Sequence, residues 1–464
     1  MTFRAENLRA ILGHPSCPDE RADKHRMVTM AASTWKQLVS SKRLRPSSEP
    51  TRGDDGNEFL SDYYRVVFSS SFRRLQDKTQ VSPLASTDYV RRRLTHSVEV
   101  AVVGERMGRV LARRLQAQFA GEDLRDDFGK IVATACLLHD IGNPPFGHEG
   151  EMAIRSWADR SCVDCADYRC FDGNAQGFRI AVRLQHQGKA YGLNLTAATL
   201  STMLKYPVVP VFDARKVPAP ALRNRGKWSV MASEQHQYEA VRELVGLADG
   251  QRHPLSYVVE AADDIVNRLV DIEDAIKLKL VSYSDVCDTL RDLKEARANK
   301  LLDAMEDQRK AMTVGTAGER ELWAYQTFRV NATTGLAQAC EQVFEENVEA
   351  LKNGTFTGEL VAKCEFSGIY NAIKKLENER IFGDAGIVRV EAGGKAAIEG
   401  LLTIFSQEVE QRSKLADTVP EFPTHEQDAA PDPHANVRRV VDYVSGMTDR
   451  FAISLYQELS GMSL

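Results

Sequence analysis

Apolar residues recur every three or four positions along several stretches of the chain, as they do on the buried face of a helix. Residues 95–115 carry such a stripe through Val103 and Met107, and residues 127–142 and 254–278 show similar spacings. The pattern predicts three strong helices in these segments. Weaker patterns predict further helices at 285–312, 318–352, 358–380, 395–415 and 435–460.

The segments between these helices have the composition of loops. Residues 1–57 are polar and broken, and residues 205–220 are punctuated by proline. Four prolines between 420 and 433 mark a linker before the last helix. Alternating patterns typical of strands are scarce, so we predict an all-α fold.

The composition is that of a globular protein and excludes several classes. The chain has 464 residues and a net charge of −5, which excludes a protein that coats nucleic acid by bulk charge but allows a local basic patch. Eight cysteines are too few for a disulfide scaffold of this length. The longest apolar runs are far shorter than the ~18 residues of a membrane span, and the first residues lack the apolar core of a signal peptide. We therefore expect a cytoplasmic protein that is not embedded in a membrane.

Three separated segments carry residues suited to metal chemistry. His139 and Asp140 form a doublet at the end of an apolar helix. His96 precedes this doublet, and Asp263 follows it in the third strong helix. Two imidazoles and two carboxylates suit a divalent ion such as Mn, Fe, Co, Ni, Zn or Mg. A single histidine is more often a helix-end or surface residue, but the doublet together with the downstream aspartate favours a metal site.

A longer motif surrounds the doublet, LLHDIGNPPFGHEGE at 137–151. This segment and six others resemble, in the same order over about residues 60–460, the HD-domain deoxynucleoside triphosphate triphosphohydrolases, the dGTPase family. The other six are FRRLQDKTQV (72–81), YVRRRLTHSVEVA (89–101), FDGNAQGFRI (171–180), LKYP (204–207), HPLSYVVEAADDI (253–265) and DYVSGMTDRFA (442–452). The resemblance implies an HD-domain helical core with additional helical lobes.

The resemblance also implies a domain organisation. Residues 1–57 are expected to form an irregular N-terminal extension and residues 58–285 the HD-domain catalytic core. Residues 286–419 are a helical elaboration, and residues 420–464 are a proline-rich linker with a C-terminal helix that completes the substrate pocket.

The resemblance implies four metal ligands and a divalent ion, Mn²⁺ or Mg²⁺, with Co²⁺, Ni²⁺, Fe²⁺ and Zn²⁺ as alternatives. Asp263 is favoured over Asp264 as a ligand because it is the first aspartate of the family motif. The alanines before Asp263 leave room for another helix, whereas Asp264 lies about 100° round the helix and is expected at the surface or behind the ligands. The four implied ligands are His96, His139, Asp140 and Asp263.

His148 and Glu151 are the catalytic pair that the resemblance implies. They are three residues apart, so they share one face if a helix begins there. Glu151 would then fix the imidazole tautomer while His148 moves a proton. The alternative is that both residues cap the start of a helix.

A triphosphate substrate needs cations and a sugar pocket. Arg93, Lys205 and Lys227 are similar to the phosphate-binding cations of the family, and Gln80 and Val81 to residues that contact the deoxyribose. Asp271, on the same helical face as Asp263, is similar to the carboxylate that accepts a hydrogen bond from the 3′-hydroxyl. The resemblance assigns three further residues to the substrate pocket: Asn174, Asn267 and Tyr443.

Two features depart from the family pattern. Asn267 stands where the family usually has tyrosine, so we expect a looser sugar pocket and weaker selection for dGTP. Cys162, Cys165 and Cys170 form a cluster without a second C-x-x-C motif. Plain thiols are favoured there, with a structural zinc site or a redox switch as alternatives.

The expected activity is metal-dependent hydrolysis of dGTP and other dNTPs to deoxynucleoside and inorganic triphosphate. Two alternatives remain open. One is another HD-domain phosphohydrolase, a nucleotidase or phosphodiesterase, and the other is a regulator with a degenerate site that binds single-stranded nucleic acid. The family also suggests a homo-oligomer, a tetramer or hexamer, and allows a single-stranded DNA effector.

Overall fold

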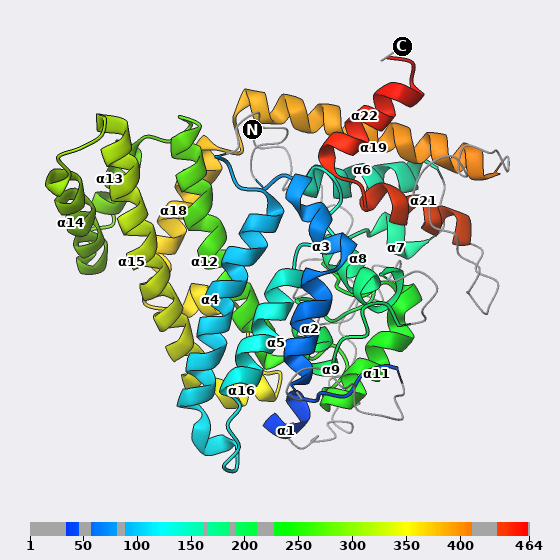
Figure 1. Ribbon diagram of the computed structural model, residues 1–464, viewed down its shortest axis with the longest axis horizontal. Helices are drawn as coiled ribbons and strands as arrows, with labels where there is room; N and C mark the ends of the chain where they lie inside the picture. Colours follow the sequence, from blue (N-terminus) through cyan, green and yellow to red (C-terminus); the bar gives the residue numbers. More distant parts are fainter. Residues whose placement is uncertain are drawn as a thin grey trace, which may run out of the picture. The chain divides into compact units, whose positions relative to one another are not determined.

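A computed structural model describes residues 34–45, 57–80, 89–161, 165–185, 191–210, 227–410 and 434–462. Over these ranges the secondary structure is helical, with two isolated β-bridges and no sheet, which confirms the all-α prediction (Figure 1). The domain boundaries expected at 57, 285 and 419 stay predictions. The helices are α1 (Trp35–Leu38), α2 (Glu58–Val67), α3 (Ser70–Arg74), α4 (Arg93–Arg114), α5 (Arg125–Leu138), α6 (Gly147–Arg160), α7 (Ala166–Arg169), α8 (Gly173–Arg179), α9 (Ala197–Thr202), α11 (Gln235–Val245), α12 (Pro254–Lys277), α13 (Tyr283–Asp292), α14 (Ala296–Ala311), α15 (Ala317–Glu346), α16 (Val348–Lys352), α17 (Leu360–Lys363), α18 (Ser367–Arg380), α19 (Ala385–Glu410), α21 (Ala435–Ser445) and α22 (Asp449–Leu459).

The three strongest predicted helices correspond to α4, α5 and α12, but several predicted boundaries were wrong. Helix α5 ends at Leu138, so the His-Asp doublet lies in the turn that follows it. The helix expected at 285–312 is broken where Lys294 adopts a positive φ, between α13 and α14. The last predicted helix is two helices because Thr448 caps the start of α22 by accepting from the Phe451 N–H. Apolar spacing continues across such breaks, so it did not reveal them.

Helices α4, α5 and α12 pack against one another at the centre of the fold (Figure 1). Gly104 of α4 makes their close approach possible. A Cβ at this position would lie 2.6 Å from Cys136 Sγ of α5 and 3.6 Å from Ala262 Cβ of α12. Gly108, one turn later, similarly faces the Phe128 carbonyl, which would be 2.7 Å from an added Cβ. Small residues thus bring together the helix segments next to the doublet and next to Asp263.

The chain after the doublet is fixed against α8. A Cβ on Gly142 would lie 2.1 Å from the Gly177 nitrogen, so backbone meets backbone at this point. Two prolines follow, and Phe146 adopts a left-handed conformation with φ of 61° before α6 begins at Gly147. This turn places the first residues of α6 close to the metal-ligand candidates.

A second apolar cluster forms where α6 packs against α19 and α19 packs against α21 and α22. A buried ion-pair group joins the C-terminal helices to the core. Arg179 of α8 donates from Nη2 to Asp442 Oδ2 at 2.7 Å and also pairs with Glu234. All three side chains are almost completely buried, and removing one member of such a group typically costs about 3–5 kcal/mol.

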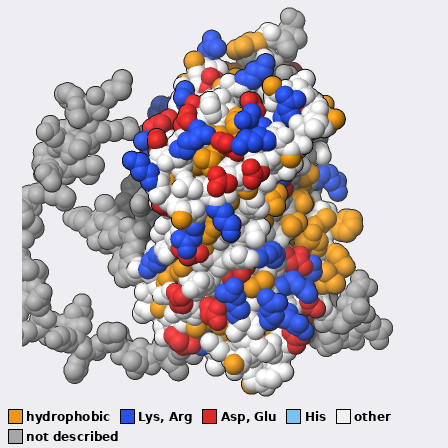
Figure 2. Space-filling model, turned by 90° about the vertical axis from the view of Figure 1, so that its left-hand side faces the viewer, with side chains coloured by type: hydrophobic (Ala, Val, Ile, Leu, Met, Phe, Trp, Pro, Cys, Tyr) orange, Lys and Arg blue, Asp and Glu red, His pale blue; other side chains and the backbone are white. Residues whose placement is uncertain are grey.

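The helices α13, α14 and α15 pack together at the left of Figure 1. Figure 2 shows the molecule from this side, with Lys and Arg side chains interspersed among Asp and Glu. Cationic and anionic side chains are thus mixed on this face, whereas a surface that binds nucleic acid typically carries a continuous cationic patch. Within the described ranges, every helix is too short or too polar to cross a membrane.

The tight packing around Gly104 predicts that alanine destabilises the protein at this position but not at a glycine with free space around it. Gly104→Ala should lower the free energy of unfolding by about 1–3 kcal/mol, because the added methyl group overlaps Cys136 and Val132. Gly393→Ala in α19 is the matched control, since an added Cβ there has no described neighbour within 4 Å. The control should be neutral or slightly stabilising. Denaturant unfolding checks this, and equal stability of the two variants would contradict the tight packing.

Candidate metal centre

Four donor side chains from three segments meet between α4, α5 and α12. Asp263 Oδ1 lies 3.1 Å from His96 Nε2 and 3.4 Å from His139 Nε2. Asp140 Oδ2 lies 3.6 Å from His139 Nε2. One donor atom from each of His96, His139 and Asp140 falls within 4.8 Å of the others. The structure therefore brings together all four residues proposed as ligands.

The hydrogen bonding around the imidazoles fits a metal site. His139 Nδ1 lies 2.6 Å from the Cys136 carbonyl oxygen, and only a protonated Nδ1 can make that bond. In the neutral imidazole, Nε2 then carries a lone pair directed at carboxylate oxygens that have no proton to give. A cation between these atoms resolves the conflict. His96 is fully buried and its Nε2 faces the same space.

The electrostatics of the cluster also favour a cation. Burial lowers the pKa of His139, but Asp140 and Asp263 outweigh this and hold the pKa above its usual value. Burial raises the pKa of Asp263, yet the two imidazoles lower it by more, so this carboxylate stays ionised. The cluster thus concentrates negative charge and stabilises positive charge, whether a proton or a divalent ion.

Asp264 has different contacts from its neighbour Asp263, which is the first aspartate of the motif and the one favoured as a metal ligand. Its surroundings are Lys205, Asp263 and Glu260, and its pKa is raised to about 7 by burial first and then by the two carboxylates. No contact with an imidazole is found for it among the described residues, whereas Asp263 contacts both. The donor set is therefore best described with Asp263.

Arg93, the first residue of α4, is part of the centre. Its Nη1 donates to Asp140 Oδ2 at 2.6 Å, and its guanidinium lies against Gly147, where a Cβ would be 2.6 Å from Nη2. Asn143 donates to the other Asp140 oxygen. Arg93 thus connects the metal-ligand candidates to the start of α6.

Lys78 is a buried residue of the centre that the sequence did not distinguish from the other lysines. Its Nζ donates to the carbonyl oxygens of Asn143 at 2.5 Å and Ser445 at 3.0 Å. Burial, opposed by Asp449, lowers its pKa to about 7. Lys78 lies within the FRRLQDKTQV segment, but only its burial marks it as unusual.

His148 and Glu151 lie on one face of α6, in agreement with the helix expected there. His148 Nδ1 is 3.0 Å from Glu151 Oε2, and Glu151 Oε1 accepts from the Gly173 N–H at 2.7 Å. The His148 side chain is 79% exposed, whereas Glu151 is buried. Burial raises the pKa of Glu151, but its bonds to His148 and Gly173 lower it below the usual value. A fixed carboxylate thus orients an accessible imidazole.

Two of the three cations proposed for phosphate binding have carboxylate partners. Arg93 pairs with Asp140, and Lys205 Nζ lies 3.2 Å from Glu260 Oε1. The charge of Lys205 also acts on Asp263, so this lysine lies near the ligand set. Lys227 is half-buried and acts electrostatically on Asp172.

The residues proposed for the sugar lie along α12 and opposite it. Asn267 Oδ1 accepts from Gln80 Nε2 at 3.1 Å, so a hydrogen-bonded amide pair occupies this position on α12. Asp271, one turn further along α12, is buried. Val81 lies outside the described residues.

The remaining candidates have other contacts. Both the backbone N–H and the side chain of Asn174 donate to Asp172 Oδ1, so this asparagine supports the turn into α8. The Tyr443 ring packs edge-on against Phe405 at 5.4 Å in the second apolar cluster. The structure does not show Tyr443 in contact with the ligand set.

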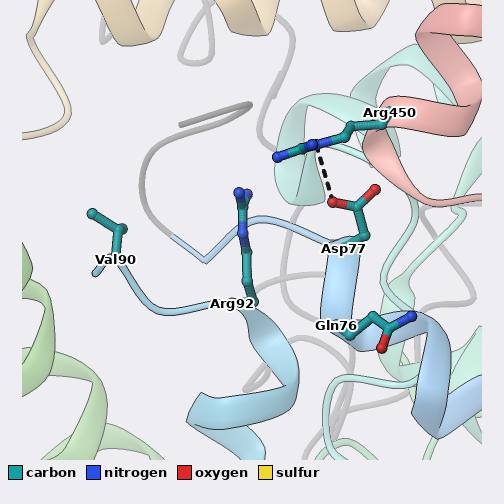
Figure 3. Close-up of a pocket in the computed structure, with 5 residues that line it drawn as sticks. All are labelled: Gln76, Asp77, Val90, Arg92 and Arg450. Carbon is teal, nitrogen blue, oxygen red and sulfur yellow. Dashed lines mark ion pairs between the residues drawn. The ribbon is translucent and has the colours of Figure 1, made fainter. Parts of the chain in front are cut away.

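A pocket of ≈ 490 Å³ opens beside the start of α4 (Figure 3). Arg450 of α22 and Asp77 form an ion pair there, with Nε and Oδ1 3.3 Å apart. This size suits a small ligand, and Arg92 in its wall directly precedes Arg93. None of the four ligand candidates lines it. The lining residues are Gln76, Asp77, Val90, Arg92 and Arg450.

Cys165 and Cys170 are free thiols whose pKa values are raised, chiefly by burial. A raised pKa keeps these cysteines in the thiol form, which is a poor metal ligand and nucleophile. Cys162 lies outside the described residues.

Two protein-family models match separate parts of this chain, and several known proteins are similar to it over most of its length. Residues 93–164 match the HD domain, and residues 365–458 match the phosphohydrolase-associated domain. A deoxyguanosinetriphosphate triphosphohydrolase-like protein of Synechocystis is 34% identical over 93% of this chain and 100% of its own length. A protein of the same name from Pseudomonas aeruginosa is 33% identical over 92% of this chain and 99% of its own. A deoxyguanosinetriphosphate triphosphohydrolase of Klebsiella pneumoniae is 29% identical over 92% and 97%.

The contacts of Asp263 predict how metal binding responds to substitution. Asp263→Asn should weaken Mn²⁺ binding by more than the roughly 10–100-fold that loss of an outer partner costs, because a ligand and its charge are both lost. Asp264→Asn is the matched control and should retain binding. Isothermal titration of metal-free protein with Mn²⁺ checks this. Equal losses in the two variants would contradict the assignment of the ligand.

Proposed function

Because the chain belongs to the deoxyguanosinetriphosphate triphosphohydrolase-like family of HD-domain phosphohydrolases, we propose that it hydrolyses deoxynucleoside triphosphates to deoxynucleoside and inorganic triphosphate. The observation that carries this proposal is that Arg93 links the donor set, through Asp140, to the start of α6, which carries the His148–Glu151 pair. A donor set, a proton-transfer pair and a cation are what hydrolysis of a phosphate ester requires.

The metal would be held by His96, His139, Asp140 and Asp263. When bound, a divalent ion such as Mn²⁺ or Mg²⁺ supplies Lewis-acid polarisation of a phosphoryl oxygen and lowers the pKa of coordinated water. The ionised state of Asp263 and the bond from His139 Nδ1 to the Cys136 carbonyl prepare the donor atoms for such an ion.

Arg93 and Lys205 would neutralise the phosphates. Both are fixed beside carboxylates of the centre, so their cationic groups are positioned before substrate arrives. Lys227 is a third candidate, on the side of Asp172.

His148 would transfer the proton. Because Nδ1 is bonded to Glu151, Nε2 is the ring atom left to take a proton from the attacking water or to give one to the departing 5′-oxygen. Glu151 cannot rotate freely because Gly173 holds its other oxygen. The pair therefore has the arrangement of general acid–base catalysis, with the carboxylate orienting the base.

The sugar would lie along α12, between the ligand set and Asp271. Asp263, Asn267 and Asp271 follow one another at intervals of four residues and so lie near one face of the helix. Gln80 faces this stretch through its bond to Asn267. We further propose that the active form is a homo-oligomer and that single-stranded DNA is a candidate effector, as the family suggests.

The proposed role of the His148–Glu151 pair predicts a loss of turnover when His148 is replaced. His148→Ala should lower turnover on the order of 10²-fold or more while leaving metal bound, because His148 transfers a proton but holds no metal. His236→Ala, on an exposed face of α11, is the matched control. Turnover and metal content of purified protein are the measurements. A variant that loses its metal would show that His148 is a ligand instead.

The amide pair at Asn267 predicts relaxed nucleotide selection. An aromatic ring at this position would fix the sugar by packing worth about 0.5–1.5 kcal/mol, which an amide does not supply. The protein with Mn²⁺ should therefore hydrolyse several dNTPs, with kcat/KM values for dGTP, dATP, dCTP and dTTP within about 100-fold of one another. A larger preference for dGTP over all three others would refute the loose pocket.

Product analysis in the same assay tests the reaction class. Inorganic triphosphate together with deoxynucleoside supports the proposed activity. Phosphate or pyrophosphate would instead indicate another HD-domain phosphohydrolase. Absence of hydrolysis, with salt-sensitive binding of single-stranded DNA, would indicate a regulator.

A further inference from the structure

Two carboxyl groups from different parts of the chain are in contact inside the protein. Helices α12 and α18 pack against each other, and the carboxyl groups of Asp271 on α12 and Glu377 on α18 are close enough to act on one another. Asp271 is 3% exposed and Glu377 is 0% exposed, so water cannot separate their charges. Two ionised carboxylates in contact at such a depth repel strongly, and such a pair normally retains a proton.

The unpaired oxygens of the two side chains also indicate that Asp271 and Glu377 share a proton. Asp271 Oδ1 and Glu377 Oε1 are both buried oxygens that lack a donor among the described residues. Each would be a costly unsatisfied acceptor if both groups were ionised. One proton held between the two carboxyls supplies the missing donor.

The neighbouring charges decide which carboxyl keeps the proton. Arg268 donates to the second Glu377 oxygen, Oε2, and so stabilises the negative charge on Glu377. Burial and the Glu377 carboxylate raise the pKa of Asp271 well above its usual range, with Arg268 opposing them only in part. The proton therefore resides on Asp271, which donates it to Glu377.

Among the described residues, the other titratable groups found to act on the pair do not supply a second cation to Asp271. Asp274 of α12 adds negative charge and is itself bonded to Arg91. Tyr370 of α18 bonds to Arg268, and Lys374 acts on Glu377. Tyr325 of α15 donates its hydroxyl proton to the Leu269 carbonyl.

We propose that Glu377 is a positioning residue for sugar recognition. Its carboxylate accepts a hydrogen bond from the protonated carboxyl group of Asp271, so that Asp271 contacts the nucleotide as a neutral carboxylic acid. This inference rests on the proposed function, in which Asp271 lies at the sugar. A neutral acid offers a carbonyl oxygen to a sugar hydroxyl without adding negative charge next to a triphosphate. It also gives the phosphohydrolase-associated domain, which contains Glu377, a direct part in substrate binding.

The proposal predicts how KM responds to pH. In the unmodified enzyme, KM for a dNTP should rise at the pH, above the ordinary range of a carboxyl group, at which Asp271 loses its proton and repels the phosphates. In Glu377→Gln the charge that helps to hold the proton is lost while the burial of Asp271 remains, so the rise in KM should move to lower pH. The rise should amount to about tenfold, with a smaller change in kcat.

A control and a second variant separate this role from a structural one. Glu379→Gln, exposed on the same helix, should match the unmodified enzyme in KM and in its pH profile. Asp271→Asn should remove the pH dependence of KM, because an amide does not titrate. A flat KM in the unmodified enzyme, or an unchanged pH profile in Glu377→Gln, would overturn the proposal.

A measurement without substrate tests the proton itself. Difference infrared spectroscopy of the unmodified protein against Asp271→Asn at neutral pH should show the C=O band of a protonated carboxylic acid. A carboxylate band in its place would overturn the inference even if dNTP hydrolysis is observed. Conversely, the protonated band in a protein that hydrolyses no dNTP would leave the shared proton standing and reject the proposed function.

Discussion

The close approach of α4, α5 and α12 is the constraint on which the rest of the structure depends. Gly104 brings the backbone of α4 to within contact of Cys136 and Ala262, each of which precedes a metal-ligand candidate. At this separation Asp263 Oδ1 lies 3.1 Å from His96 Nε2 and 3.4 Å from His139 Nε2, and Asp140 Oδ2 lies 3.6 Å from His139 Nε2. Larger residues at the junction would separate the donors, so the packing of apolar helices sets the geometry of a polar site.

Placing carboxylates inside such a junction has an electrostatic cost that the surrounding residues offset. Arg93 bonds to Asp140 and the imidazoles face Asp263, and each contact favours the ionised carboxylate. The cations proposed for phosphate binding are thus also the cations that stabilise the free protein. Under the proposed function, a bound triphosphate would have to compete with Asp140 for Arg93 and with Glu260 for Lys205.

The sequence was informative where chemistry is encoded locally. The apolar stripes identified α4, α5 and α12, and the His-Asp doublet with the downstream aspartate identified the donor set. It was uninformative where a residue acquires its role from burial or from a distant contact. Lys78 and Glu377 are ordinary charged residues in the sequence, and only the tertiary structure surrounds one with carbonyl oxygens and places the other against Asp271.

Helix boundaries were missed for a related reason. The breaks at Lys294 and before Thr448 depend on single backbone conformations and caps, which apolar spacing does not register. The placement of Tyr443 in the substrate pocket stays a prediction, because an aromatic residue can line a pocket and also pack against a core. The structure shows its ring packed against Phe405.

The C-terminal part of the chain stabilises the segments that carry the candidate site. Asp449, at the start of α22, is 1% exposed and accepts hydrogen bonds from two backbone N–H groups. Thr79, next to Gln80, donates to its Oδ2 at 2.9 Å, and Phe146, two residues before His148, donates to its Oδ1 at 3.1 Å. One carboxylate therefore fixes both the segment next to Gln80 and the turn that begins α6. Asp442 and Glu377 lie in the same part of the chain and make buried contacts with α8 and α12, so the segment that matches the phosphohydrolase-associated domain is packed into the core rather than appended to it.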